Sequence, residues 1–523
     1  MGSSPEPPFH PIVYVRGYAG TQSEVEDTVA TPYMGFNVGA TKVRQRWDGK
    51  IVRHVFESPL VRLMKDHGYR DIYSDGSEIA DEPLPPRSVV IYRYYEPVSE
   101  DLGAGVRPEI EQYAQGLDAL IGRLRRQVCA HTGQDPRTFR VYLVAHSMGG
   151  LICRCFLQNP RCGSAENRAA VDKVYTYATP HGGIDVRLLG NVPGFFTRNN
   201  ADVFNRERMR EFLALADDTT DVRSLDGKFD PRRFFCLVGT NAHDYPAAAG
   251  LSRLAVGDLS DGLVRIENAA VRGTPRAFVH RSHSGHYGVV NSEEGYQNLT
   301  RFLFGDVRVD GVLEVAAVDL PPAVKRAYDA QQRVRASYHF EVVVRPRGAT
   351  WVLHSRSADE RSAIFRSFDE MLRPEPGVAP RHPHLFSIFL SARNRTRQGK
   401  GTLVFAVDLR VRVPDYEIDG RLFFKDHIEG SHLYTRTIVI GAVPPADEKG
   451  TWSVRYGFNP LARDPTPRDA ERVPAGAGDA VGGAGAGAGA GAAAGAIVFK
   501  IPIDRTQRPG IQATLVLTAR PWS

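Results

Sequence analysis

Ser147 stands in a stretch whose residue types suit a catalytic nucleophile. An apolar run, Val141–Val144, leads through Ala-His-Ser-Met-Gly-Gly at Ala145–Gly150 into a helical pattern. A serine nucleophile has to stand at a sharp turn between a strand and a helix, where it is exposed to substrate. Small residues two positions before and after it, Ala145 and Gly149, let the strand and the helix pass closely. The N-terminus of that helix then favours the negative charge that develops during the reaction.

Carboxylates and histidines follow this serine in the chain. Serine needs a base to take its proton, and the base needs a carboxylate to orient it. Asp258 and Asp261 share one turn, although an aspartate before glycine is also frequent in turns that do no chemistry. Three histidines come next, at His280, His283 and His286. Their clustering after the candidate acids indicates that one of them is the base.

The Ala145–Gly150 stretch resembles the nucleophile elbow of the lipase and esterase branch of the α/β-hydrolase superfamily. Most of that family has glycine where this chain has Ala145, a departure that some bacterial lipases share. The resemblance extends through separated motifs over about residues 10–305. It implies a doubly wound, mainly parallel α/β sheet and a triad in the chain order serine, acid, histidine.

Within this resemblance, Ser147 is the nucleophile. Asp261 is the acid, because its Ser-Asp-Gly-Leu-Val context is similar to the acid loop of many lipases, and Asp258 is the alternative. His286 fits the family's histidine best, since it stands shortly before the last helix of this region and is followed by glycine and small apolar residues. His283 is the alternative base.

Two backbone N–H groups have to bind the oxyanion of the tetrahedral intermediate. The residue after the nucleophile, Met148, supplies one of them in this family. Val-Arg-Gly-Tyr-Ala-Gly at Val15–Gly20 resembles the Val-His-Gly-x-x-Gly turn of lipases, which implies Tyr18 as the second donor. Arg16 replaces the family's histidine and changes the polarity of the pocket edge, but the donor is a backbone group. His181 precedes the acid, the wrong order for a base, and we expect it to be structural or to line the pocket.

Strands and helices in alternation are the elements that have to position these residues. Five short runs are apolar nearly throughout, as strands buried on both faces of a parallel sheet are. The runs are Pro11–Val15, Ser88–Tyr92, Phe139–Val144, Lys173–Tyr177 and Phe234–Val238. Helical spacing predicts helices at Ile110–Val128, Gly150–Gln158 and Asn291–Phe304. This alternation predicts a doubly wound α/β sheet.

Two long stretches interrupt the alternation, Glu57–Pro86 and Gly182–Arg232. In an α/β sheet such insertions lie over the carboxyl ends of the strands, where ligands bind. We interpret residues 182–232 as a lid, and an ordinary excursion of packed helices fits the pattern equally well. The phenylalanines of this insertion favour either a hydrophobic acyl chain as ligand or the lid's own core. They are Phe195, Phe196, Phe204 and Phe212.

From Val307 onward apolar and polar residues alternate, which predicts an antiparallel β-sandwich. The clearest runs are Tyr338–Arg345, Leu385–Leu390, Leu403–Val413, Thr435–Ile440, Thr451–Tyr456 and Ala513–Leu517. One helix is expected at Ala358–Leu372. Glycine and alanine make up nearly all of residues 475–496, which predicts a disordered surface loop. We therefore expect a catalytic domain at residues 1–308 and a β-rich accessory domain at residues 309–523.

The bulk composition agrees with two globular domains. The chain has 523 residues, whereas a single hydrophobic core stops growing at roughly 250–300 residues. Its net charge of +6 comes from basic residues spread among acidic ones, without a Lys/Arg block interleaved with aromatics, so we expect no nucleic-acid partner. Five scattered cysteines predict reduced thiols rather than a disulfide framework or a zinc site. We expect no metal and no cofactor.

The start of the chain lacks the charged and apolar regions of a secretory signal, and no run of 18 apolar residues occurs. These features predict a cytoplasmic protein, with export by a route that needs no cleaved signal left open. The mildly basic charge leaves a peripheral contact with an anionic lipid surface open as well.

Together, these motifs predict hydrolysis of carboxylic esters, preferably lipid-like ones, through an acyl-enzyme. The same triad would serve acyl transfer to another acceptor or amide hydrolysis. A different class of function is also open, in which the chain binds lipid or a partner and the β-rich half is the working part. Its aromatic residues would then be the contacts, including Trp351, Phe423, Phe424 and Trp452.

Overall fold

The computed structural model describes residues 8–18, 22–31, 33–72, 82–101, 103, 105, 108–184, 201–243, 259–373, 381–394, 401–419, 425–443, 452–459, 468–473, 496–503 and 505–523. These residues form two compact units, Pro8–Leu303 and Phe304–Ser523. The division lies close to the boundary expected between residues 308 and 309. Each unit has a hydrophobic core of its own.

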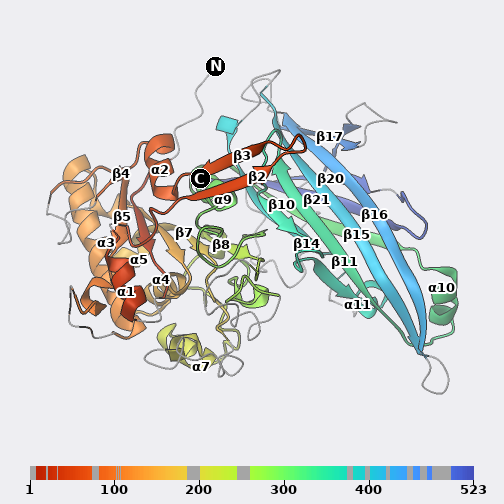
Figure 1. Ribbon diagram of the computed structural model, residues 1–523, viewed down its shortest axis with the longest axis horizontal. Helices are drawn as coiled ribbons and strands as arrows, with labels where there is room; N and C mark the ends of the chain where they lie inside the picture. The colour runs from red at the N-terminus through yellow and green to blue at the C-terminus, as the bar shows by residue number, and fades with distance from the viewer. Residues whose placement is uncertain are drawn as a thin grey trace. The chain divides into compact units, whose positions relative to one another are not determined.

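A parallel sheet is the centre of the first unit, with the strand order β4-β5-β1-β6-β7-β8-β9 (Figure 1). Its strands are β1 Ile12–Val15, β4 Arg70–Asp71, β5 Ser88–Tyr92, β6 Val141–His146, β7 Val171–Tyr177, β8 Phe234–Gly239 and β9 Arg276–Val279. β1 pairs with β6, so that Val15 lies opposite Ala145. The turns that follow these two strands therefore meet at the carboxyl edge of the sheet, where ligands bind in such folds.

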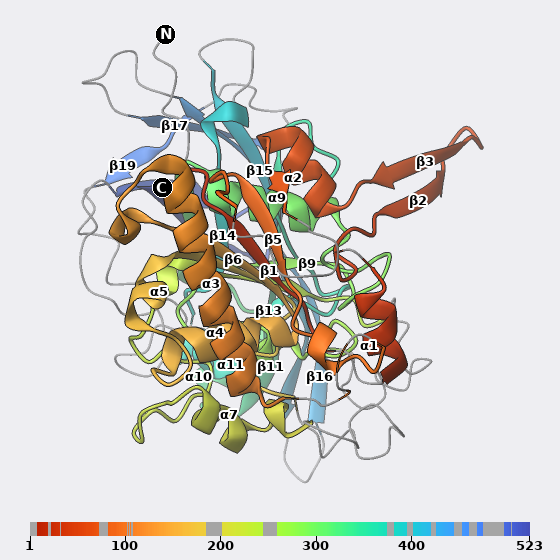
Figure 2. The same ribbon diagram turned by 90° about the vertical axis from the view of Figure 1, so that its left-hand side faces the viewer.

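Helices cover both faces of this sheet. They are α1 Gln22–Val29, α2 Pro59–His67, α3 Ile110–Thr132, α4 Met148–Gln158, α5 Ala165–Ala170, α7 Arg206–Phe212 and α9 Glu293–Phe304. Neighbouring strand residues such as Val174 and Tyr175 point to opposite faces. Val174 belongs to the core that α3 and α4 complete, and these helices cross in front of β1 and β6 in Figure 2. On the other face, the ring of Tyr175 packs against Phe302 of α9.

Local sequence sets where the helices begin and end. α3 begins with a capping box in which Glu109 and Gln112 bond each other's backbone, and it ends at Gly133 in the left-handed conformation. α2 begins after Ser58, whose side chain accepts a hydrogen bond from the N–H of Val61. These caps satisfy backbone groups that a helix leaves without intrahelical partners.

The five expected strands all lie in the parallel sheet, and the three expected helices occur with ends shifted by a few residues. The expected interruption Glu57–Pro86 contains α2 and β4. Sequence reasoning did not find the separate antiparallel hairpin of β2 (Ala40–Gln45) and β3 (Ile51–Phe56). Charged residues are frequent in both strands, so they lack the continuous apolar character of the sheet strands.

Two antiparallel sheets form the second unit. One has the order β14-β10-β21-β20-β19, and the other has β12-β11-β15-β16-β17-β18 with β13 also paired to β11. The strands are β10 Val307–Val318, β11 Val334–Pro346, β12 His354–Arg356, β13 Ile364–Ser367, β14 His384–Leu390, β15 Leu403–Asp419, β16 Lys425–Val443, β17 Ser453–Asn459, β18 Arg468–Asp469, β19 Glu471–Val473, β20 Ile497–Ile503 and β21 Ile511–Pro521. Apolar side chains of both sheets share one core, as in a sandwich.

The helix expected at Ala358–Leu372 is wrong for most of its length. Helix α11 covers only Phe368–Leu372, and α10 (Pro322–Asp329) is a helix that the pattern did not indicate. The N–H of Ser362 bonds the carbonyl oxygen of Ser357 and closes a turn between β12 and β13. Both strands pair with β11, and this tertiary pairing overrides the local helical spacing. The expected loop at residues 475–496 lies outside the described residues except for its last position.

Candidate active site

Ser147 stands at the turn between β6 and α4. Its backbone has φ 52° and ψ −128°, a strained conformation that residues other than glycine rarely adopt. A Cβ on Gly17 would lie 2.6 Å from the Cβ of Ser147, and a Cβ on Gly149 would lie 2.3 Å from the carbonyl oxygen of Val15. The N–H of Ser147 donates to the carbonyl oxygen of Tyr177 at 2.9 Å. Gly17, on the neighbouring turn, and Gly149, in α4, are thus sterically required by this turn.

His283 connects Ser147 with Asp261. Its Nε2 lies 2.9 Å from the Oγ of Ser147, and its Nδ1 lies 3.0 Å from the Oδ2 of Asp261. All three side chains are buried. The other carboxylate oxygen of Asp261, Oδ1, accepts the N–H groups of Leu263 at 3.0 Å and Val264 at 2.7 Å. The backbone therefore holds the carboxylate in the position from which it orients the imidazole ring.

A closed loop holds His283 in place. The N–H of Val289 donates to the carbonyl oxygen of Ser282, and the N–H of His283 donates to the carbonyl oxygen of Asp261 at 2.9 Å. The Nε2 of His146 lies 2.9 Å from the carbonyl oxygen of His283. Burial, with a smaller contribution from His283, lowers the pKa of His146 to about 3. The ring of His146 is therefore neutral near pH 7 and donates this hydrogen bond from Nε2–H.

The structure separates the two candidate bases. His283, the alternative in the sequence, contacts Ser147, whereas His286, the preferred base, is exposed at the tip of the loop. The preference for His286 is therefore corrected, because the loop closes directly before His283 and keeps that residue beside Asp261. Asp261, the preferred candidate acid, lies beside the ring of His283, and Asp258 lies outside the described residues.

Tyr18 follows the close approach at Gly17. The hydroxyls of Tyr94 and Tyr95 donate to the carbonyl oxygen of Gly17 at 3.1 Å and 3.0 Å. In a trans peptide the C=O and the next N–H point in opposite directions, so these bonds turn the N–H of Tyr18 away from the two tyrosines. Met148 is the first residue of α4, where an N–H has no acceptor within the helix. Sequence reasoning missed both tyrosines, although aromatic residues directly after β5 were a usable signal.

A small pocket of about 80 Å³ lies beside Ser147. Ile184, Phe204 and Leu263 supply apolar walls, and Arg16 lines the same pocket. The Nη1 of Arg16 donates to a backbone carbonyl oxygen, that of Met34, and burial lowers the pKa of the guanidinium from its ordinary value. The pocket therefore combines an apolar wall with one cationic side chain.

The expected lid at residues 182–232 is described only at residues 182–184 and 201–232. Phe204 lines the pocket and, like Phe212 of α7, is buried in the hydrophobic core. Phe195 and Phe196 lie outside the described residues. Both described phenylalanines thus serve packing, and one of them also faces the pocket.

Arg154 of α4 ties this insertion to the sheet. Its guanidinium is fully buried and donates to the carbonyl oxygens of His181 at 3.2 Å, Val222 at 2.8 Å and Ser224 at 2.7 Å, and its Nε donates to Gln158 at 2.9 Å. Burial lowers its pKa to about 10, which leaves it charged near pH 7. His181 is fully buried as well. One buried cation therefore joins α4 to the residue before the insertion and to the later part of the insertion itself.

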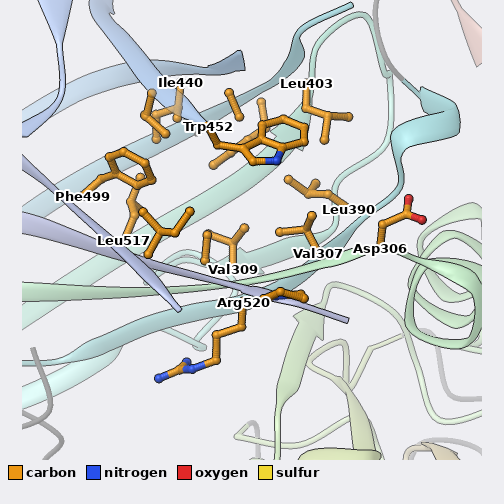
Figure 3. Close-up of a pocket in the computed structure, with 16 residues that line it drawn as sticks. Asp306, Val307, Val309, Leu390, Leu403, Ile440, Trp452, Phe499, Leu517 and Arg520 are labelled. Carbon is orange, nitrogen blue, oxygen red and sulfur yellow. The ribbon is translucent and has the colours of Figure 1, made fainter. Parts of the chain in front are cut away.

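A second cavity lies inside the sandwich of the second unit. It encloses about 290 Å³, and strands of both sheets line it (Figure 3). Val309 and Leu517 come from one sheet, and Leu403 comes from the other. Figure 3 shows the guanidinium of Arg520 pointing away from these apolar side chains; it donates to Asp310 at 2.9 Å. The interior of this cavity is apolar.

The two tryptophans expected as surface contacts of the β-rich half are partly buried. Trp452 lines the sandwich cavity, and both Trp452 and Trp351 are partly buried against the core. Phe423 and Phe424 lie outside the described residues. The described tryptophans therefore do not form an exposed aromatic surface on the sandwich.

Comparisons with known proteins give only distant likenesses. No protein-family model matches the chain, and no curated protein matches it. The lipase BlEst2 of Bacillus licheniformis in its propeptide form is similar with a TM-score of 0.31 and 12% identity, over 86% of this chain and 96% of that one. A putative cell surface hydrolase of Lactobacillus plantarum has a TM-score of 0.23 and 14% identity, over 56% and 90% of the two chains. At these values the comparisons assign no family.

No helix among the described residues is both long enough and apolar enough to cross a membrane. No group of three or more histidine, cysteine, aspartate or glutamate side chains in the described ranges could hold a metal ion. The five cysteines are free thiols, and all except Cys129 are buried.

Proposed function

We propose that this protein is a serine hydrolase that cleaves carboxylic esters. The observation that carries the proposal is the hydrogen-bonded series of Ser147, His283 and Asp261, with distances of 2.9 Å and 3.0 Å. These are the contacts that a nucleophile, its base and an orienting acid require. The strained backbone of Ser147 supports the same assignment, since strain of this kind is concentrated at functional sites.

The reaction follows from these contacts. As the Oγ of Ser147 attacks the ester carbonyl carbon, the Nε2 of His283 takes the hydroxyl proton, and Asp261 stabilises the imidazolium that forms. The C–O bond to the alcohol then breaks, and His283 returns the proton to the departing oxygen. Water repeats the sequence on the acyl-enzyme: His283 takes its proton, the carboxylic acid departs, and Ser147 regains its hydrogen.

The backbone N–H groups of Met148 and Tyr18 are the proposed oxyanion donors. The first stands at the N-terminus of α4, where the helix dipole favours negative charge. The second is directed by Tyr94 and Tyr95, which hold the carbonyl oxygen of the preceding residue, Gly17, from the opposite side. Loss of one such donor typically lowers kcat by about 100- to 1,000-fold.

The pocket favours an ester with an apolar acyl group. Ile184, Phe204 and Leu263 form an apolar wall beside Ser147, and Arg16 offers a cation to an anionic or polar part of the substrate. This combination supports a lipid-like ester. Acyl transfer and amide hydrolysis use the same triad, and product analysis would separate them from ester hydrolysis.

Hydrolysis of p-nitrophenyl esters of graded acyl length tests the proposal. Wild type is expected to release p-nitrophenol and to react with a fluorophosphonate probe, and Ser147→Ala is expected to lose both. Ser284→Ala is the matched control, because Ser284 lines the same pocket without a contact to His283 Nε2 among those described. Equal labelling of wild type and Ser147→Ala would overturn the assignment of the nucleophile.

The sandwich cavity favours a second candidate function, the binding of an aliphatic chain. An apolar interior of about 290 Å³ offers no hydrogen-bond partner at its centre and suits a hydrocarbon. Trp452 lines it and would report an occupant through its fluorescence. We expect a fatty acid to change the emission of the full-length Ser147→Ala protein, and a Leu517→Trp variant that fills the cavity to abolish binding. Unchanged affinity in that variant would rule the cavity out.

A further inference from the structure

The hairpin of β2 and β3 has an apolar face that is open to solvent. In an antiparallel pair, residues directly opposite each other lie on the same face. Val43 is opposite Arg53, Gln45 is opposite Ile51, and Thr41 is opposite Val55. One face therefore carries Val43, Ile51 and Val55, whose exposed fractions are 57%, 70% and 72%. We call the segment Ala40–Phe56 the docking hairpin.

Trp47 stands at the tip of the docking hairpin. The N–H of Arg46 donates to the carbonyl oxygen of Lys50, and Gly49 takes a φ of 78° that lets the chain turn back. Trp47 is 93% exposed in this turn. β2 and β3 pair only with each other among the described strands, and Figure 2 shows them extending as a ribbon apart from β1 and β5. A two-stranded hairpin is marginally stable in water, so a solvated apolar face of this kind indicates a partner.

The charge of the docking hairpin indicates what that partner is. The segment contains one acidic residue, Asp48, against five basic ones, which are Lys42, Arg44, Arg46, Lys50 and Arg53. A tryptophan at the tip with apolar and basic neighbours suits the interface of an anionic bilayer, where amphipathic rings lie at headgroup level and cations meet lipid phosphates. A symmetric contact with a second copy would bring like charges together.

The base of the docking hairpin adjoins the loop of the proposed base. Thr41 and Val55 line the same hollow as His286 and Tyr287, and His283 belongs to that loop. Tyr287 is itself an exposed aromatic residue. Contact of this face with a lipid surface would therefore lie next to the site rather than far from it.

We propose that the docking hairpin binds the catalytic unit to an anionic phospholipid surface. Trp47, Val43, Ile51 and Val55 enter the interfacial layer, and Arg46, Lys50 and Arg53 contact phosphate groups. The proposal rests on the proposed ester hydrolysis in one respect: binding at a membrane surface gives that reaction a lipid substrate. The binding itself requires no catalysis.

Co-sedimentation with vesicles of phosphatidylcholine and phosphatidylglycerol tests the binding in the full-length Ser147→Ala protein. We expect Trp47→Ala to weaken binding by about tenfold, since an apolar ring loses its burial. Each basic residue contributes about fivefold at an anionic surface, so Arg46→Gln, Lys50→Gln and Arg53→Gln together should weaken it by about 100-fold. Matched controls are Phe365→Ala, an exposed aromatic in the second unit, and the triple variant Arg126→Gln, Arg137→Gln, Arg232→Gln, all of which should bind like the parent.

Three outcomes would overturn the proposal. The parent would remain in the supernatant, or the hairpin variants would bind as tightly as the controls. Alternatively, sedimentation would show a dimer that Trp47→Ala disrupts, with no vesicle binding, and a second copy would then occupy the hairpin. A Trp47→Ala variant that retains Ser147 should still hydrolyse a short soluble ester, because the hairpin lies outside the catalytic contacts. This assay separates a failure of membrane binding from a failure of the proposed reaction.

Discussion

The pocket beside Ser147 and the cavity inside the sandwich are built in opposite ways. The pocket has about 80 Å³, and fixed hydrogen bonds hold the polar groups around it. The cavity has about 290 Å³, and its interior is apolar. The carboxyl edge of a parallel sheet gathers turns with free backbone groups and side chains. In a sandwich the paired strands use their backbone groups in the ladder, so mainly apolar side chains face inward.

The two units differ in the chemistry that they can support. Catalysis requires polar groups held in one geometry. The first unit meets that requirement with hydrogen bonds to the carboxylate of Asp261 and to the carbonyl oxygens of Gly17 and His283. The cavity of the sandwich has an apolar interior and therefore suits binding.

Replacement of His283, one of the two candidate bases, should have the largest effect on activity. His283→Ala should lower kcat for a p-nitrophenyl ester by about a millionfold, the size of effect known for removal of one member of a triad. His286→Ala, the control, should leave kcat essentially unchanged, because its side chain is exposed at the tip of the loop. Comparable losses in both variants would mean that the loop rearranges around the substrate.

Acid should destabilise the first unit through its buried histidines. Burial lowers the pKa of His146 to about 3 and that of His10 to about 4, from an ordinary value of 6.5. Between these values the unfolded chain binds more protons than the folded chain, so the free energy of unfolding falls as the pH decreases from about 6.5 toward 4. Urea midpoints at pH 7.5, 6.0 and 4.5 measure this.

His146→Gln is the variant that checks the source of this pH dependence. It should flatten the decline, whereas His427→Gln, at an exposed site, should not. A decline of the same slope in wild type and His146→Gln would assign the pH dependence to other groups.

Loss of the buried arginine should destabilise the protein without touching the triad. Arg154→Met leaves the carbonyl oxygens of His181 and Val222 without the donor that satisfies them. Buried polar groups left unsatisfied cost about 1–3 kcal/mol each, so we expect a loss of about 3 kcal/mol in the free energy of unfolding. Chemical denaturation measures it, with Arg137→Met at an exposed site as the control. If Arg154→Met lowers the free energy of unfolding by less than Arg137→Met does, water replaces the guanidinium as donor.

Filling of the sandwich cavity should have the smallest effect. The sign of the change in the free energy of unfolding tests the contrast between the cavity and the pocket. Ala519 of β21 lines the cavity, so Ala519→Val should raise the free energy of unfolding by about 0.5–1 kcal/mol and leave esterase activity unchanged. The matched change at the active site, Gly17→Ala, brings a Cβ within 2.6 Å of the Cβ of Ser147 and should lower activity. Destabilisation by Ala519→Val would mean that the cavity has no room for two methyl groups.

Much of the first unit could be predicted because its signals are local. An apolar run such as Val141–Val144 becomes a strand where helices cover both faces of a parallel sheet, and Gly149 is required by the turn itself. The expected helix at Ala358–Leu372 failed because pairing with β11 decides that segment from a distant part of the chain. Local spacing does not contain that pairing.

The sequence alone specified the sharp turn at Ser147, the strands that support it and the order in which candidate acid and base follow. Only the tertiary structure decided between His283 and His286, because the choice depends on where the loop closes and on the carbonyl contact with His146. It also decided that Val43, Ile51 and Val55 share one open face, since that follows from strand register. Sequence patterns specify elements; contacts between distant elements specify which side chains meet.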